Sequence, residues 1–292
     1  MSNFYSILIN IARSTGNYRL TRLFYHILEK IGLVHLGHYL FNFWFYIKPT
    51  QKMKNEKQFF SEHATELKAV YDFLEDDRSR SVFENILKYR ATSDWACLKR
   101  SKAKDSARTQ YFVPELQFSD HEIIVDCGAF NGDTAKRFYE NVPGCRVIAL
   151  EPDEKNFKLL QELALPGLEC IKAGAWSEDA TLSFSDEGGG TDSGAIADSG
   201  NTEIEVKALD NLSECRPATY IKMDIEGAEL EALKGAEKII RERRPKLAIC
   251  IYHKPQDFFE IPLYIKKLNP DYKLFIHHHT SFYALETVLY AV

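Results

Sequence analysis

The residues best placed to do chemistry lie in the run from Ile123 to Thr134. Its apolar residues predict a short buried strand that ends in Asp126, followed by a turn and the start of a helix. In an open parallel sheet such a turn lies at the carboxyl edge, where ligands bind. Gly128 and Gly132 let the backbone turn sharply and leave room for a ligand. Carboxylates on both sides make the turn a poor site for a pyrophosphate, and they favour a ligand that is cationic or rich in hydroxyl groups.

Further acids are expected at the same edge of the sheet. Glu151 ends an apolar strand about 20 residues after the glycine turn, the spacing at which nucleotide-binding sheets place a carboxylate on ribose hydroxyls. Asp224 and Glu226 follow another short apolar strand, and Gly227 lets the chain turn into the next helix. One such acid could simply cap a helix, but three strand ends with acids favour a shared ligand site. Glu229 is instead expected to stand in the first turn of the helix after Gly227, where the helix dipole stabilises a carboxylate.

The composition describes a globular protein. The 292 residues are 45% apolar and carry a formal charge of −5, which suits one large domain or a catalytic domain with an N-terminal extension. The mild acidity argues against a nucleic-acid partner. The six cysteines are dispersed and include no C-x-x-C pair, so we expect reduced thiols and a cytoplasmic protein.

An N-terminal helical region is expected over residues 1–118. Apolar residues at three- and four-residue intervals predict three helices, at residues 20–31, 62–74 and 79–89. Pro49 and the polar run 51–58 indicate a linker after the first of them. The basic stretch 99–108 has no large apolar residue, so we expect a solvated loop there.

The segment 31–47 contains no lysine, arginine, aspartate or glutamate. It is slightly short for a membrane-spanning helix and carries two histidines and an asparagine. We favour a buried helix. The alternative is an interfacial helix, which would add peripheral membrane contact to the expected cytoplasmic location.

Beyond residue 118 strand patterns alternate with helix patterns, and one domain is expected over 119–292. Short apolar runs predict strands at 123–127, 146–150, 168–172, 220–223, 246–252, 273–277 and 287–290. Helices are expected at 134–141, 154–163 and 229–243. This order predicts a mostly parallel sheet with helices on both faces, whose last strand is antiparallel because a short connection precedes it. Residues 185–201 are expected to form a mobile loop between hairpin strands at 181–184 and 203–208.

From about residue 120 to its end, the chain resembles the FkbM family of S-adenosylmethionine-dependent methyltransferases. The matching motifs are VDCGAFNGDT, ALEPD, AGAW, KMDIEGAELEALKGA, IYH and ETVLYA. Phe130 stands where many members have asparagine, so a polar contact in the turn is missing. The resemblance implies an α/β fold with a Rossmann-like seven-stranded methyltransferase sheet, an N-terminal helical extension, and S-adenosyl-L-methionine as the cofactor.

The resemblance also implies which residues meet the methyl donor. Asp126 and the glycine turn would lie at its amino-acid end, Glu151 would accept hydrogen bonds from the ribose hydroxyls, and Asp224 would face the methionine end. A row of carboxylates suits this cation better than a dinucleotide. The residues expected to bind the cofactor are Asp126, Gly128, Gly132, Asp133, Thr134, Glu151, Asp153 and Asp224.

The catalytic residues are expected to be His253, Asp224 and Glu226. His253 follows a strand that opens onto the same crevice and is the candidate base for an alcohol acceptor, with a structural role as the alternative. Asp224 or Glu226 could accept the proton instead, or bind a divalent metal that acidifies the hydroxyl. We assign no metal ligand. Three histidines stand at 277–279, but neighbouring strand residues point to opposite faces. They are therefore expected to face solvent or the acceptor, with a metal-binding role as the alternative.

The expected function is methyl transfer to a hydroxyl of a glycan sugar or a small metabolite. One alternative is a non-catalytic scaffold that retains the methyltransferase fold. The other is an NAD-dependent oxidoreductase, which needs a glycine where Phe130 stands. The loop 185–201 is expected to help close the site over its ligands.

Overall fold

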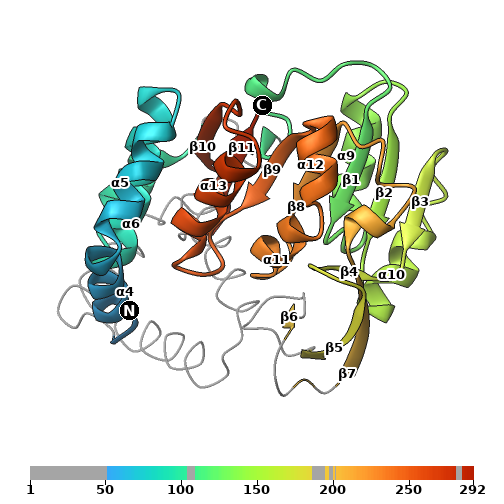
Figure 1. The fold of residues 1–292 in the computed structure, drawn as a ribbon, viewed down its shortest axis with the longest axis horizontal. Coiled ribbons are helices and arrows are strands. Elements are labelled where there is room, and N and C mark those ends of the chain that lie inside the picture. The colour runs from blue at the N-terminus through green and yellow to red at the C-terminus, as the bar shows by residue number, and fades with distance from the viewer. Residues whose placement is uncertain (1–50, 104–108, 186–194, 197–199, 201, 281–284) are drawn as a thin grey trace, which may run out of the picture.

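A seven-stranded sheet forms the centre of the molecule (Figure 1). The computed structural model describes residues 51–103, 109–185, 195–196, 200, 202–280 and 285–292. The strands of the sheet are β1 (Ile123–Cys127), β2 (Arg146–Leu150), β3 (Leu168–Ile171), β8 (Tyr220–Met223), β9 (Lys246–Cys250), β10 (Leu274–His278) and β11 (Thr287–Ala291). Their spatial order is β10-β11-β9-β8-β1-β2-β3, and only β11 runs antiparallel to its neighbours. The expected fold class is confirmed.

Helices cover both faces of this sheet. On one face lie α9 (Asp133–Asn141) and α10 (Glu154–Gln161), and on the other lie α11 (Glu229–Lys234), α12 (Glu237–Arg243) and α13 (Asp257–Leu268). Neighbouring strand residues point to opposite faces. Ile124 therefore packs in the core with α9 and α10, and Val125 packs in the core with α11 to α13.

A smaller sheet lies beside the carboxyl end of the large one (Figure 1). It consists of β4 (Gly174–Ala175), β5 (Ala180–Ser185), β6 (Ala195–Ile196) and β7 (Thr202–Lys207). Two short 3-10 helices, η1 (Pro114–Leu116) and η2 (Leu209–Asn211), lie outside both sheets. β5 and β7 pair antiparallel, which confirms the expected hairpin. Most of the expected loop 185–201 lies outside the described residues.

The N-terminal helices cover the β10 edge of the large sheet. They are α4 (Gln51–Glu62), α5 (Ala64–Phe73), α6 (Asp77–Thr92) and α7 (Trp95–Ser101). The backbone N–H of Ile276 donates to Ser79 Oγ at 3.0 Å, and Leu74 and Lys102 form single bridges to β10. Covering an edge strand in this way blocks its pairing with another chain.

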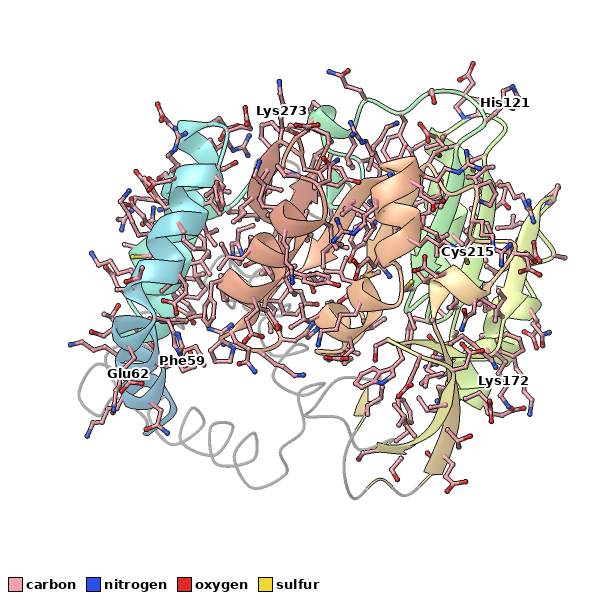
Figure 2. The ribbon with its side chains drawn as sticks, viewed as in Figure 1. Phe59, Glu62, His121, Lys172, Cys215 and Lys273 are labelled. Carbon is pink, nitrogen blue, oxygen red and sulfur yellow. The ribbon has the colours of Figure 1, made fainter. Side chains whose placement is uncertain are left out.

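The expected linker at residues 51–58 is wrong, because these residues belong to α4. Tertiary contacts stabilise this polar helix: Phe59 lies 5.9 Å from Phe259 between ring centroids, and Glu56 pairs with Arg90. Figure 2 shows Phe59 on the inner side of α4 and Glu62 on its outer side. Residues 99–101 likewise belong to a helix, α7, whereas 104–108 lie outside the described residues.

The expected single helix at 229–243 is two helices that meet at Gly235 and Ala236. A Cβ on Gly235 would lie 1.9 Å from the carbonyl oxygen of Trp176, so this close backbone approach requires glycine. No helix in the described part of the chain is long and apolar enough to cross a membrane. The expected helix at 20–31 and the segment 31–47 lie outside that part.

A buried ion pair connects α4 and α6 to the end of strand β9. Arg90 donates through Nε and Nη2 to Glu56 at 3.0 Å each, and through Nη1 to the carbonyl oxygen of Tyr252 at 2.8 Å. Both side chains of the pair are less than 10% exposed. A bidentate arginine in this position fixes the helices and the strand end relative to one another.

Arg90→Ala should lower the free energy of unfolding by about 3–5 kcal/mol, because it leaves the Glu56 carboxylate buried without its partner. Urea unfolding of the full chain measures the change. Arg78→Ala, which removes an exposed arginine from the same helix, is the matched control and should change it by about 0.5 kcal/mol or less. Equal effects of the two substitutions would show that the ion pair of Arg90 with Glu56 does not stabilise the fold.

Candidate functional site

The glycine turn after β1 is fixed on both sides by neighbouring strands. The backbone N–H groups of Gly128 and Ala129 both donate to the carbonyl oxygen of Leu150 at 3.1 Å. Gly128 has a φ of +76°, and a Cβ there would lie 2.0 Å from the carbonyl oxygen of Asp224. Only glycine allows this approach, and it brings the carboxyl ends of β1, β2 and β8 together, as the strand-end acids predicted.

Asp126 lies beneath the turn and is completely buried. The ammonium of Lys222, from the neighbouring strand β8, approaches its Oδ1 to 2.9 Å and donates to the carbonyl oxygen of Gly128 at 2.8 Å. Burial alone would lower the pKa of Lys222, but the carboxylates of Asp126 and Asp224 outweigh it and raise the pKa well above its ordinary value. The lysine therefore stays charged and holds the turn. Oδ2 of Asp126 has no hydrogen-bond partner within the described residues.

Glu151 joins the end of β2 to the glycine turn. Its two oxygens accept the backbone N–H groups of Phe130 at 2.8 Å and of Asp153 at 2.9 Å, and the residue is only 6% exposed. Burial raises its pKa to about 7, although these two hydrogen bonds oppose the change. Each oxygen keeps a lone pair with which it can accept a further donor.

The remaining residues expected to bind the cofactor have local structural contacts. Asp133 is exposed in the first turn of α9 and pairs with Lys136 at 3.2 Å. Gly132 begins that helix with a φ of +82°, and Thr134 is half-buried within it. Asp153 caps α10 by accepting the backbone N–H of Asn156 at 2.8 Å. Their contacts with a ligand stay predictions.

Asp224, which follows β8, lies at the centre of the site. Tyr111 donates its hydroxyl to Oδ2 and Tyr252 donates its hydroxyl to Oδ1, each at 3.0 Å. Burial opposes ionisation of the carboxyl, but the positive charges of Lys222 and His253, with hydrogen bonds from the Cys250 thiol and the Tyr111 hydroxyl, lower its pKa below that of an ordinary aspartate. The side chain is 26% exposed, so a charged acceptor of hydrogen bonds is partly accessible at the end of β8.

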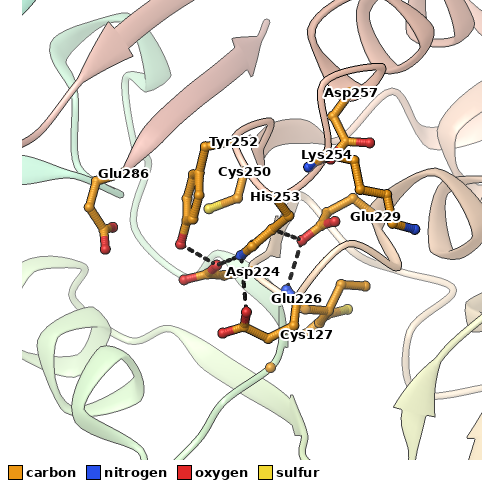
Figure 3. A network of polar contacts seen from close by, with 12 residues as sticks. Cys127, Asp224, Glu226, Glu229, Cys250, Tyr252, His253, Lys254, Asp257 and Glu286 are labelled. Carbon is orange, nitrogen blue, oxygen red and sulfur yellow. Dashed lines mark hydrogen bonds and ion pairs between the residues drawn. The ribbon is translucent and has the colours of Figure 1, made fainter. Parts of the chain in front are cut away.

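The imidazole of His253 lies among three carboxylates (Figure 3). Nδ1 is 2.9 Å from Oε1 of Glu229, and Nε2 is 3.6 Å from both Asp224 Oδ1 and Glu226 Oε2. Burial lowers the pKa of His253, but the charge and hydrogen bond of Glu229, with the charges of Asp224 and Glu226, raise it to about 9. The three expected catalytic residues are thus brought together, with His253 held as a cation at neutral pH.

Glu229 does more than interact with a helix dipole. It is completely buried, and its Oε1 also accepts the backbone N–H of Ile225 at 2.9 Å. Asp257, at the start of α13, is near enough in space to interact with Glu229. Burial together with the charge of Glu229 raises the pKa of Asp257 to about 7. Glu229 therefore positions His253, a role that its place in the sequence did not indicate.

The three histidines at 277–279 are not exposed, so they do not face solvent, and the alternative place beside the acceptor stays a prediction. His277 lies 3.3 Å from Glu115, His278 Nδ1 lies 3.0 Å from the hydroxyl of Thr287, and His279 Nε2 lies 2.7 Å from the hydroxyl of Tyr290. Each is less than 5% exposed. His277 and His279 both lie beside the ring of Tyr290 in β11, which contributes to their burial.

Sequence reasoning missed several residues of the site. Lys222 had a signal, since a lysine within a short apolar strand needs a buried partner. The aromatic residues at 111 and 252 had none, because they reach Asp224 only in the folded chain. Glu286 was also missed: it precedes β11, accepts Gln110 Nε2 at 2.5 Å, and lies on the far side of Tyr252 from His253 (Figure 3).

Comparisons with known proteins agree with this geometry. The family model of the methyltransferase FkbM domain matches residues 126–279, more than half of the chain. A solved structure of methyltransferase FkbM from Methylobacillus flagellatus KT is 28% identical with a TM-score of 0.69, and the match covers 80% of this chain and 60% of that chain. The chain thus spans less than two thirds of that relative. No curated protein matches the chain.

More distant structures share less of the fold. Fibrillarin from Aeropyrum pernix, in complex with S-adenosyl-L-methionine, is 12% identical with a TM-score of 0.41, and the match covers 62% of this chain and 70% of that chain. An rRNA methylase from Streptococcus thermophilus is 16% identical with a TM-score of 0.38, and the match covers 63% of this chain and 92% of that chain.

Lys222→Met should lower the free energy of unfolding by about 3–5 kcal/mol, because it leaves Asp126 charged and buried without a partner. Adding Asp126→Asn removes that charge and should recover much of the loss. Urea unfolding of the wild type, both single variants and the double variant measures the coupling between the two side chains. A double variant as unstable as Lys222→Met would show that the ion pair is not the cause.

Proposed function

Since the chain belongs to the FkbM family of methyltransferases, whose methyl donor is S-adenosyl-L-methionine, we propose that it methylates a hydroxyl oxygen of a glycan sugar or a small metabolite. The observation that supports this proposal most is the row of carboxylates at the carboxyl ends of β1, β2 and β8, beside His253. The donor is a small-molecule partner, and no nucleic-acid partner is proposed.

The chemistry of these residues fits the methyl donor. S-adenosyl-L-methionine carries a sulfonium, an ammonium group and two ribose hydroxyls, so it offers positive charge and hydrogen-bond donors. Asp126, Glu151 and Asp224 offer only acceptors when they are ionised. Each oxygen of Glu151 keeps a second lone pair for such donors, whereas Oδ2 of Asp126 has no hydrogen-bond partner among the described residues but is buried. A pyrophosphate of a dinucleotide would meet repulsion at the same edge.

The catalytic group that we propose is His253 with Asp224 and Glu226. The bound donor supplies an electrophilic methyl carbon on a sulfonium sulfur, so alignment and exclusion of water supply much of the rate. The acceptor oxygen must also lose its proton as the new C–O bond forms. His253 accepts that proton only in its neutral form, and its pKa of about 9 makes this the minor form at neutral pH. Asp224 and Glu226 are both partly exposed and ready to bind the hydroxyl.

The first test follows a methyl label from the donor into fractionated glycans and metabolites of the source cell. We expect label in one fraction with the wild type, and His253→Ala should reduce the rate by about 10²–10⁴. Calorimetry of this variant with S-adenosylhomocysteine should give an affinity within about twofold of the wild type, because the charged partners of His253 follow β8, whereas the proposed ribose ligand Glu151 follows β2. His121→Ala removes an exposed histidine and is the control. Full turnover by His253→Ala would exclude it from the catalytic group.

The second test uses the raised pKa of Glu151. Above pH 7 the side chain is a carboxylate that accepts the ribose hydroxyls, whereas below pH 7 it binds a proton and loses that capacity. The Kd of S-adenosylhomocysteine should therefore rise about tenfold from pH 8 to pH 6. In Glu151→Gln the affinity should be weaker at pH 8, by about 1.5–3 kcal/mol, and nearly independent of pH. Parallel pH profiles of the two proteins would contradict the ribose assignment.

A further inference from the structure

Three carboxylates surround one buried imidazole at the end of β9. One ligand atom each from Asp224, Glu229 and His253 lies within 4.8 Å of the others, and Glu226 lies 3.6 Å from the same ring. A single imidazolium leaves this group with an excess of negative charge. Glu229 is completely buried, and its Oε2 has no hydrogen-bond partner among the residues that the structure describes. Buried charges of this kind are found paired or bound to metal ions.

The neighbouring lysines are engaged elsewhere. Lys222 pairs with Asp126 and with carbonyl oxygens of the glycine turn. Lys254 donates its ammonium to the carbonyl oxygen of Gly227 at 2.5 Å. Within the described part of the chain, neither lysine makes an ion pair with the three carboxylates around His253. A further positive charge would stabilise the group.

The two ring nitrogens of His253 have different surroundings. Nδ1 lies at hydrogen-bond distance from Glu229, the arrangement in which a carboxylate holds a metal-binding histidine in one orientation. The side chain of His253 is 91% buried. Its Nε2 is buried as well and has no hydrogen-bond partner among the described residues. It faces Asp224 and Glu226 at 3.6 Å each, too far for a hydrogen bond. Ligand atoms around a tetrahedral ion lie about 3.4 Å apart, since each is about 2.1 Å from the ion.

We propose that Nε2 of His253 and the carboxylate of Asp224 bind a divalent cation, with Glu229 holding the ring and Glu226 adding negative charge beside it. This inference rests on the proposed function, and it makes His253 a ligand rather than the base. An imidazole with a carboxylate suits Mn²⁺ or Zn²⁺. The acceptor hydroxyl would bind the cation and lose its proton to water. As its oxygen bonds to the methyl carbon, the electron pair of the broken C–S bond stays on the sulfur.

The test measures binding of Mn²⁺ to the full chain after treatment with EDTA and removal of the chelator. Electron paramagnetic resonance follows the free Mn²⁺ in the absence of donor and acceptor. We expect one Mn²⁺ per chain, displaced by Zn²⁺, and at least tenfold weaker binding to His253→Ala and Asp224→Asn. Glu229→Gln should weaken binding by about 10–100-fold, because it removes only the carboxylate that orients the ring.

The control is Glu169→Gln, which removes a partly exposed carboxylate from β3 and should leave Mn²⁺ binding unchanged. Thermal unfolding checks the fold of each variant, and Asp224→Asn decides the result if His253→Ala does not fold. Absence of Mn²⁺ and Zn²⁺ binding, or equal binding by wild type and Asp224→Asn, would overturn the inference. That result would leave methyl transfer standing, whereas absence of label transfer with an intact Mn²⁺ site would contradict the proposed function instead.

Discussion

The buried ion pair between Asp126 and Lys222 is the interaction on which the rest of the site depends. Two charges removed from water are tolerated only when they are paired and hydrogen-bonded. Here one ammonium serves the carboxylate and the carbonyl oxygens of Cys127 and Gly128. The pair therefore holds β8 against β1 and sets the path of the glycine turn. Because Gly128 in turn lies against the backbone of Asp224, the position of the end of β8 follows from the same contact.

The helical region before residue 118 builds part of the site as well as covering a sheet edge. Arg90 holds the carbonyl oxygen of Tyr252, and the hydroxyl of Tyr252 donates to Asp224. Tyr111 reaches the other oxygen of the same carboxylate. A change in the packing of these helices would therefore reach Asp224 through Tyr252. The boundary between residues 118 and 119 stays a prediction, but the two regions share this network.

Patterns confined to a few neighbouring residues predicted most of the fold. The apolar runs located every strand of the large sheet to within two residues at each end, because a strand buried on both faces needs continuous apolar residues. The linker expected at 51–58 failed for the opposite reason. That helix is polar, and it is stabilised by Glu56 and Phe59 contacting residues far along the chain. The break at Gly235 also depends on a distant contact, with Trp176.

The fold class, the glycine turn and the strand-end acids could be read from the sequence. The succession of strands and helices along the chain and the residue types of a turn are both local properties. Only the tertiary structure decided how these acids differ. Asp126 is neutralised by Lys222, Glu151 is linked to the turn, and Asp224 with Glu226 surrounds His253. Which charge is paired depends on the side chains that neighbouring strands bring together, and burial then sets the electrostatic strength of each pair. Neither quantity can be read along a single strand.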